Sequence, residues 1–170
     1  MQPAGIVLRE KDLPAAEYQV LARDVLEVCR QYETPCILHT YTDAALALSC
    51  DAVHLPLHIL RFLPLQTRAQ FRVLGASCHS VADAKEAENL GCTYITAGHV
   101  FLTDCKKGLP ARGLDFLESV CAAVQIPVWG IGGITPENLS LVQNAGARGG
   151  CIMSTLMQCT SPETLLMACR

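Results

Sequence analysis

The chain has 170 residues, of which 51% are hydrophobic and 17% are charged, and its formal net charge is −3 at pH 7. This composition argues against a disordered chain and fits one domain, spanning 1–170, with a sizeable core. The basic residues are fewer than the acidic ones, and the longest basic run is Lys106-Lys107. We therefore expect no nucleic-acid partner.

The ten cysteines lie singly inside apolar runs, and no two of them form a CxxC pair. This pattern is typical of small buried side chains in a reducing compartment. The first residues, 1–5, carry no basic run, and no apolar stretch approaches the roughly 18 residues of a membrane span. We expect a cytoplasmic protein that does not bind membranes.

Short apolar runs alternate with helical patterns along the whole chain. The first helical pattern has an apolar stripe at Tyr18, Leu21, Ala22, Val25, Leu26 and Cys29. Such alternation predicts a parallel sheet with right-handed crossovers. The seven expected strands are Gly5–Leu8, Pro35–Leu38, Ala52–Leu55, Arg72–Ala76, Thr93–Ala97, Pro127–Ile131 and Gly149–Met153.

Two helix boundaries are marked by capping residues. Ser80 is expected to cap a helix that stops near Gly91. Thr135 is expected to cap a second helix, with Pro136 in its first turn and Gly146 after its end.

Periodicity alone does not separate a closed barrel from an open, doubly wound sheet. Glycines follow the last two expected strands, at Gly132-Gly133 and within 149–154, where barrel enzymes commonly bind phosphate. No GxGxxG motif follows the first strand. The sequence therefore favours a TIM-type barrel.

In such a barrel the functional side chains follow the carboxyl ends of the strands. His99 is the strongest candidate, because it comes directly after Gly98 and before a polar loop with two lysines. We interpret His54 as structural and His79 as part of a helix start. The polar residues at the expected strand ends are Arg9, Lys11, His39, His54, Ser77, His79, His99, Thr103, Lys106, Lys107 and Ser154.

A zinc site and a cysteine nucleophile are both poorly supported. Pro56 interrupts the segment between His54 and His58, so their spacing of four does not bring the rings together. Cys78 and His79 are adjacent on an extended strand and point to opposite faces. We expect no metal site, and the cations Arg9, Lys11 and Lys106 suggest a phosphorylated or carboxylated ligand.

Three motifs resemble the thiamine phosphate synthase/TenI superfamily: Gly98–Gly113, Ala76–Ser80 and Ile131–Asn138. The resemblance implies a TIM-type barrel, in which Leu8–Lys11 corresponds to the second strand of the family. The chain is then expected to lack the first βα unit, about 25 residues on the usual length of such units. Seven strands leave an open edge for a partner or the C-terminal segment to cover, and we expect a homodimer.

The resemblance also separates the two branches of the superfamily. The synthase branch couples a pyrimidine pyrophosphate to a thiazole phosphate with Mg²⁺, using a glutamine, an Asn-Asp pair and a further aspartate. Those places hold Val7, His39-Thr40 and the apolar stretch 56–59, and Cys105 replaces a second threonine. These departures favour the TenI branch.

The resemblance to the TenI branch implies a thiazole tautomerase, which aromatises a carboxythiazole phosphate without a metal or an organic cofactor. His99 would be its acid/base residue, because an imidazole can take and return a proton near neutral pH. His39 would be a second proton relay or a packing replacement. The expected phosphate contacts are Gly132, Gly133, Met153 and Ser154, and the other expected substrate contacts are Arg9, Lys11, His39, Ser77, Thr103 and Lys106.

Two alternatives stay open on the sequence. One is a non-catalytic TenI-like protein that binds thiazole phosphate or thiamine phosphate or acts as a regulator. The other is a thiamine phosphate synthase. In every case the expected partner is a small phosphorylated molecule.

Overall fold

The computed structural model describes residues 3–169, except for the side chain of Cys105. The chain divides into two compact units, an N-terminal unit (Gln2–Ala76) and a C-terminal unit (Ser77–Arg170). That residues 1–170 make one domain stays a prediction.

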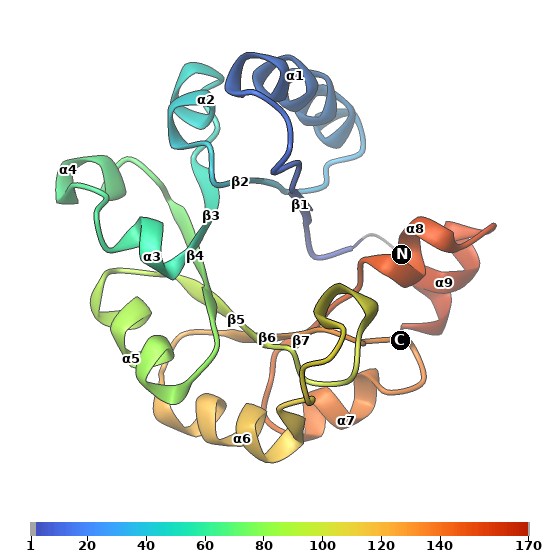
Figure 1. Ribbon diagram of the computed structural model, residues 1–170. Helices are drawn as coiled ribbons and strands as arrows, with labels where there is room; N and C mark the ends of the chain where they lie inside the picture. Colours follow the sequence, from blue (N-terminus) through green and yellow to red (C-terminus); the bar gives the residue numbers. More distant parts are fainter. Residues whose placement is uncertain (1–2, 170) are drawn as a thin grey trace. The chain divides into compact units, whose positions relative to one another are not determined.

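Residues 3–169 form an α/β fold with seven parallel strands in chain order and helices between them, as in TIM-type proteins (Figure 1). Each expected strand is confirmed to within two residues at either end, because short apolar runs between helical patterns stand out in the sequence. The strands are β1 (Ile6–Leu8), β2 (Cys36–His39), β3 (Ala52–Pro56), β4 (Val73–Cys78), β5 (Tyr94–Gly98), β6 (Val128–Ile131) and β7 (Gly149–Cys151).

In the N-terminal unit, helices pack against β2 and β3. The expected apolar stripe of the first helix is confirmed in part, because Tyr18, Ala22 and Cys29 are buried. Helices α1 and α2 contact each other, and both contact β2; Figure 1 shows the two helices side by side. The helices are α1 (Ala15–Gln31), α2 (Thr42–Ala47), α3 (Leu57–Leu60) and α4 (Leu65–Arg68).

Tyr18 fixes the carboxyl ends of β1 and β2. Its hydroxyl donates to the Leu8 carbonyl oxygen at 3.0 Å and accepts from the His39 amide nitrogen at 3.1 Å. Its ring stacks on Tyr41 with centroids 4.1 Å apart. Because Tyr18 is fully buried, both backbone groups would lose their partner without this hydroxyl.

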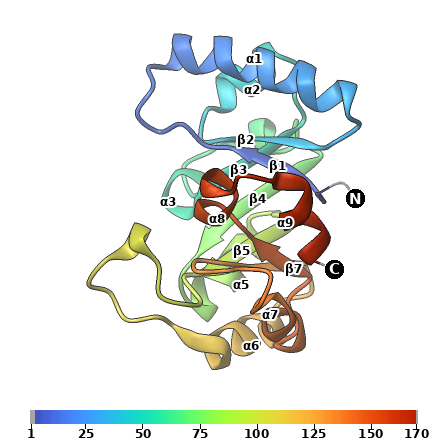
Figure 2. The same ribbon diagram turned by 90° about the vertical axis from the view of Figure 1, so that its right-hand side faces the viewer.

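In the C-terminal unit, α5, α6 and α7 follow one another along the strands (Figures 1 and 2). Their apolar faces and the strands make a core that includes Ile95, Leu117, Val120 and Val142, all fully buried. The helices are α5 (Val81–Asn89), the 3₁₀ turn η1 (Asp104–Lys106), α6 (Gly113–Ala123), α7 (Leu139–Asn144), α8 (Ser154–Gln158) and α9 (Pro162–Ala168).

One of the two predicted helix caps is confirmed and the other is wrong. Ser80 caps α5, and its hydroxyl accepts from the Asp83 amide nitrogen at 3.0 Å. By contrast, α7 begins at Leu139 after Asn138, not after Thr135. The Asn138 side chain accepts from the Thr135 amide and donates to the Gly133 carbonyl, both at 2.9 Å. These bonds hold 133–138 as a turn and delay the helix.

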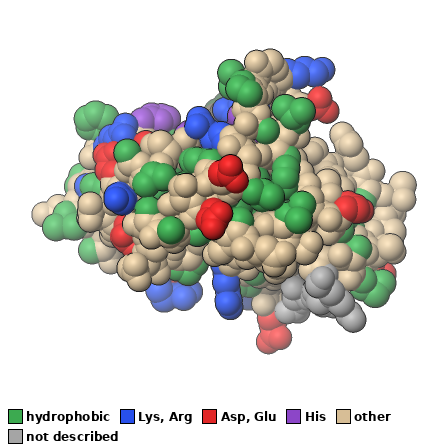
Figure 3. All heavy atoms as spheres, turned by 90° about the horizontal axis from the view of Figure 1, so that it is seen from below, with side chains coloured by type: hydrophobic (Ala, Val, Ile, Leu, Met, Phe, Trp, Pro, Cys, Tyr) green, Lys and Arg blue, Asp and Glu red, His purple; other side chains and the backbone are tan. Residues whose placement is uncertain are grey.

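All nine cysteines with a described side chain are free thiols, and five of them are buried: Cys29, Cys36, Cys50, Cys78 and Cys92. Between residues 3 and 169, no helix combines the length and the apolar character needed to cross a bilayer. On the face drawn in Figure 3, the Lys and Arg side chains are interspersed with acidic ones and form no basic patch.

Candidate functional site

His99 follows β5 directly and is 9% exposed. Among residues 3–169, its Nε2 is the one buried side-chain nitrogen or oxygen without a hydrogen-bond partner. The backbone around it is well held: the Arg112 amide donates to the His99 carbonyl at 3.1 Å. An unpartnered buried polar atom is costly, so this nitrogen is a candidate for a ligand contact.

Gly132 and Gly133 lie where the end of β6 meets the segment after β5. The Val100 and Phe101 amides donate to the Ile131 and Gly132 carbonyls at 2.9 and 3.0 Å. A Cβ on Gly132 would collide with His99, and one on Gly133 would collide with Leu102. Close packing therefore accounts for both glycines, and phosphate binding at their backbone stays a prediction.

Met153 and Ser154 lie at the same ends of the strands as Gly132 and Gly133. Ile131 of β6 pairs with Cys151 of β7, so Gly132 and Ser154 follow neighbouring strand positions. Met153 is 51% exposed, and Ser154 is the exposed first residue of α8. The structure thus brings the two predicted phosphate segments together within the C-terminal unit.

The segment after His99 forms a loop with η1 inside it, seen in Figure 2 as a projection from the strand ends. The Lys106 amide donates to the Thr103 carbonyl at 3.0 Å. The Lys106 side chain is exposed, and that of Thr103 is half-buried. Ser77, also half-buried, lies near the end of β4. Their substrate contacts stay predictions.

His79 has a ring contact that the sequence did not indicate. Its Nδ1 lies 2.8 Å from the Gly98 carbonyl oxygen, and because a carbonyl only accepts, Nδ1 carries the proton. Its amide donates to the Asp83 carboxylate at 2.9 Å, which supports the predicted role in the helix start. The ring therefore braces the residue that precedes His99.

In the N-terminal unit, Arg9 and Lys11 follow β1, and both side chains are exposed. Lys11 lies 4.0 Å from the Asp12 carboxylate, a surface contact of little energy. Arg9 is close enough to His39 for its charge to act on that ring. Within this unit, the structure thus associates the predicted ligand residues Arg9 and His39.

His39 and His54 form a buried imidazole pair. They are paired in register between β2 and β3, with ring centroids 5.6 Å apart, and are 9% and 3% exposed. Burial lowers the pKa of His39 from its ordinary 6.5 to about 4, with a further contribution from Arg9. Burial lowers the pKa of His54 to about 3, with a further contribution from His39. Both rings are therefore neutral at pH 7.

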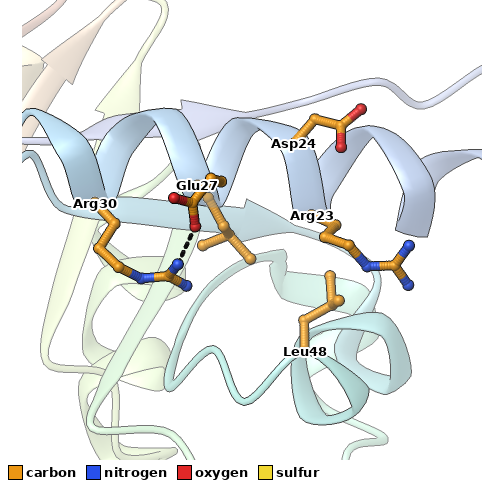
Figure 4. A pocket seen from close by; sticks show the side chains of 6 residues that line it. Arg23, Asp24, Glu27, Arg30 and Leu48 are labelled. Atoms are coloured by element: carbon orange, nitrogen blue, oxygen red, sulfur yellow. Dashed lines mark hydrogen bonds and ion pairs between the residues drawn. The ribbon is translucent and has the colours of Figure 1, made fainter.

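Two hollows, one in each unit, lie away from these residues. In the N-terminal unit, a hollow of about 300 Å³ is lined by charged residues of α1 together with Leu48, and Glu27 and Arg30 form an ion pair across part of it (Figure 4). In the C-terminal unit, a hollow of about 440 Å³ is lined by the ends of α6 and α7 and by residues leading into β6. Neither contains a predicted site residue.

The fold and the polar groups at the strand ends define a TIM-type α/β protein. A family model described as thiamine monophosphate synthase matches residues 3–156. The chain belongs to this family.

Similar proteins carry the synthase name. A "Thiamine-phosphate synthase" of Roseiflexus castenholzii is 36% identical over 96% of this chain and 73% of its own length. One of Syntrophomonas wolfei is 33% identical over 93% of this chain and 77% of its own length. The solved "Thiamine phosphate pyrophosphorylase" of Pyrococcus furiosus is 28% identical, with a TM-score of 0.84, and covers 98% of this chain and 80% of that chain.

These relatives correct the predicted function. The thiazole tautomerase interpretation, and with it the isomerase class, is wrong, because relatives similar over nearly the whole chain are named synthases. The error came from weighing a few substituted positions, such as His39 and Thr40, above the similarity of the remaining chain. The superfamily itself was identified correctly from its motifs.

Proposed function

We propose that this chain is a thiamine-phosphate synthase, a transferase that joins a pyrimidine pyrophosphate to a thiazole phosphate. The observation that carries the proposal is the similarity to named synthases, 33–36% identical over 93–96% of the chain. The solved pyrophosphorylase with a TM-score of 0.84 supports it. The likeness to the TenI branch is confined to single positions such as Gly98-His99 and is not carried further.

Two segments support binding of a phosphate group in the C-terminal unit. Gly132-Gly133 and Met153-Ser154 come together at the ends of β6 and β7. Backbone amides at such strand ends bind phosphate in many barrel enzymes. We assign the thiazole phosphate to them. The unpartnered Nε2 of His99, beside Gly132, is then available to the bound ring.

The reaction breaks the bond between a carbon and a diphosphate oxygen, and that oxygen keeps the electron pair. Negative charge therefore grows on the leaving diphosphate, and nearby cations stabilise it. We propose this role separately for Arg9 and Lys11 in the N-terminal unit and for Lys106 in the C-terminal unit, whose side chains are all exposed. Ser77, Thr103 and His39 are assigned to neutral contacts with the substrates. The carboxylates that the resemblance implies for Mg²⁺ are replaced in this chain by His39-Thr40 and the apolar stretch 56–59, which do not fit that ion.

The test is synthesis of thiamine phosphate from the two purified substrates, measured by mass spectrometry together with release of diphosphate, once with Mg²⁺ and once with EDTA. Lys106→Ala is expected to lower the rate at least tenfold, about 1.4 kcal/mol of transition-state stabilisation. Lys85→Ala, an exposed lysine on α5, is the matched control and should change nothing.

Absence of thiamine phosphate under both conditions would disprove the proposal. The same assay separates it from a non-catalytic binding protein. That alternative predicts thiazole phosphate binding in calorimetry without any product.

A further inference from the structure

His39 and Thr40 lie at the carboxyl end of β2, where the family resemblance implies an Asn-Asp pair, and the apolar stretch 56–59 lies where it implies a further aspartate. His39 and His54 stack on each other, and the Thr40 hydroxyl lies 2.7 Å from Nδ1 of His39. Within the part of the chain that the structure describes, no three His, Cys, Asp or Glu side chains are grouped to hold a metal ion. Mg²⁺ prefers carboxylate and water oxygens, and this donor set does not fit it.

The backbone at Thr40 is unusual for a threonine. Its φ is +73°, in the left-handed region, where aspartate and asparagine are enriched and β-branched residues are rare. The conformation is held by a hydrogen bond from the Thr40 amide to the His54 carbonyl at 3.0 Å. The backbone thus suits the aspartate that the resemblance places here, while the side chain is neutral and in contact with His39.

The charge of this cluster also argues against a divalent cation. The buried side chains there are the imidazoles of His39 and His54, which bring no negative charge. The charge that acts on the His39 ring is the positive guanidinium of Arg9. A cation there would be repelled, whereas an anionic group would be attracted.

We infer that this chain lacks the divalent-cation site implied by its family, because His39 and Thr40 stand in place of the Asn-Asp pair, and that it binds the diphosphate of its substrate through Arg9 without Mg²⁺. The inference rests on the proposed function for the identity of the substrate. It deepens that function by making the reaction independent of a divalent metal.

The first experiment uses the intact chain, with Mn²⁺ as the metal probe and inorganic pyrophosphate as the anion probe. Electron paramagnetic resonance should show no more bound Mn²⁺ with the chain than without it. Calorimetry should show pyrophosphate binding in EDTA that Mg²⁺ does not tighten. One Mn²⁺ bound per chain, absence of pyrophosphate binding in EDTA, or a tenfold tightening by Mg²⁺ would each overturn the inference.

Two pairs of variants test the residues. Arg9→Gln should weaken pyrophosphate binding at least tenfold in EDTA, whereas Arg72→Gln, which loses an exposed ion pair with Asp51, should not. Thr40→Asp should create Mn²⁺ binding, and Thr40→Asn is its neutral control. If Arg9→Gln binds pyrophosphate as the native chain does, or if folded Thr40→Asp binds no Mn²⁺, the inference is overturned.

The synthesis assay keeps the two proposals distinguishable. Product that forms only with Mg²⁺ supports the synthase function and overturns the metal-free inference. Product formed in EDTA supports both. Metal-independent pyrophosphate binding without any product supports the inference and disproves the function.

Discussion

The histidines of the two units differ in what surrounds their rings. In the N-terminal unit, His39 and His54 pack on each other inside the protein, and burial keeps both neutral. In the C-terminal unit, His79 is tied to the Gly98 carbonyl, and His99 keeps one nitrogen without a partner. Burial thus determines the charge of the first pair, whereas backbone contacts determine the position of the second.

The largest expected effect is a loss of stability in acid that comes from the N-terminal pair. The unfolded chain binds protons near pH 6.5, whereas the folded pKa values of His39 and His54 are about 4 and about 3. Between these values the unfolded state holds more protons, so stability falls as the pH falls below 6.5. From pH 7 to pH 5 the loss should be about 4 kcal/mol for the two histidines together.

Urea unfolding at a series of pH values measures this loss. His39→Gln, which does not titrate, should remove about half of the pH dependence, about 2 kcal/mol. His58→Gln, at an exposed position on α3, is the control and should leave it unchanged. A native curve that is flat between pH 7 and pH 5 would show that burial does not keep these imidazoles neutral.

A smaller effect is expected from the close packing behind His99. Gly132 has φ +95°, and an added Cβ would collide with His99, so Gly132→Ala should cost about 3 kcal/mol. Gly108 has φ +81° but nothing near its added Cβ, so Gly108→Ala should cost only about 1 kcal/mol, from the backbone conformation. The difference between the two losses in free energy of unfolding measures the collision of the added Cβ with His99. Equal losses would mean that β6 does not confine His99.

The strands were predictable because they are short apolar runs between helical patterns. Each expected run overlaps an observed strand, from Ile6–Leu8 to Gly149–Cys151. The start of the helix after β6 was not predictable, because the Asn138 side chain bonds to Thr135 and Gly133 across a turn. Neither bond follows from the order of the residues. A capping motif says which residue can start a helix, whereas the competing turn decides which one does.

The site was predictable only as a set of strand ends. Placing His99, Gly132 and Ser154 after strands is enough to bring them to one end of the C-terminal unit. The pairing of His39 with His54 depends on strand register, and the contact of His79 with Gly98 depends on a ring orientation. His39 and His54 hold different positions within β2 and β3, so the sequence carried no signal for the first. No sequence signal was available for the second.

The smallest effect tests whether His79 acts through its Nδ1 proton. His79→Leu removes the bond to the half-buried Gly98 carbonyl and should lower the free energy of unfolding by about 1 kcal/mol. His79→Asn places an amide N–H near the position of Nδ1 and should recover most of this loss. The backbone bond from residue 79 to Asp83 is present in both variants, so the helix start is not disturbed. If His79→Leu and His79→Asn lower the free energy of unfolding equally, the His79 ring contributes packing only. The histidines of the two units then differ only in the unpartnered nitrogen of His99.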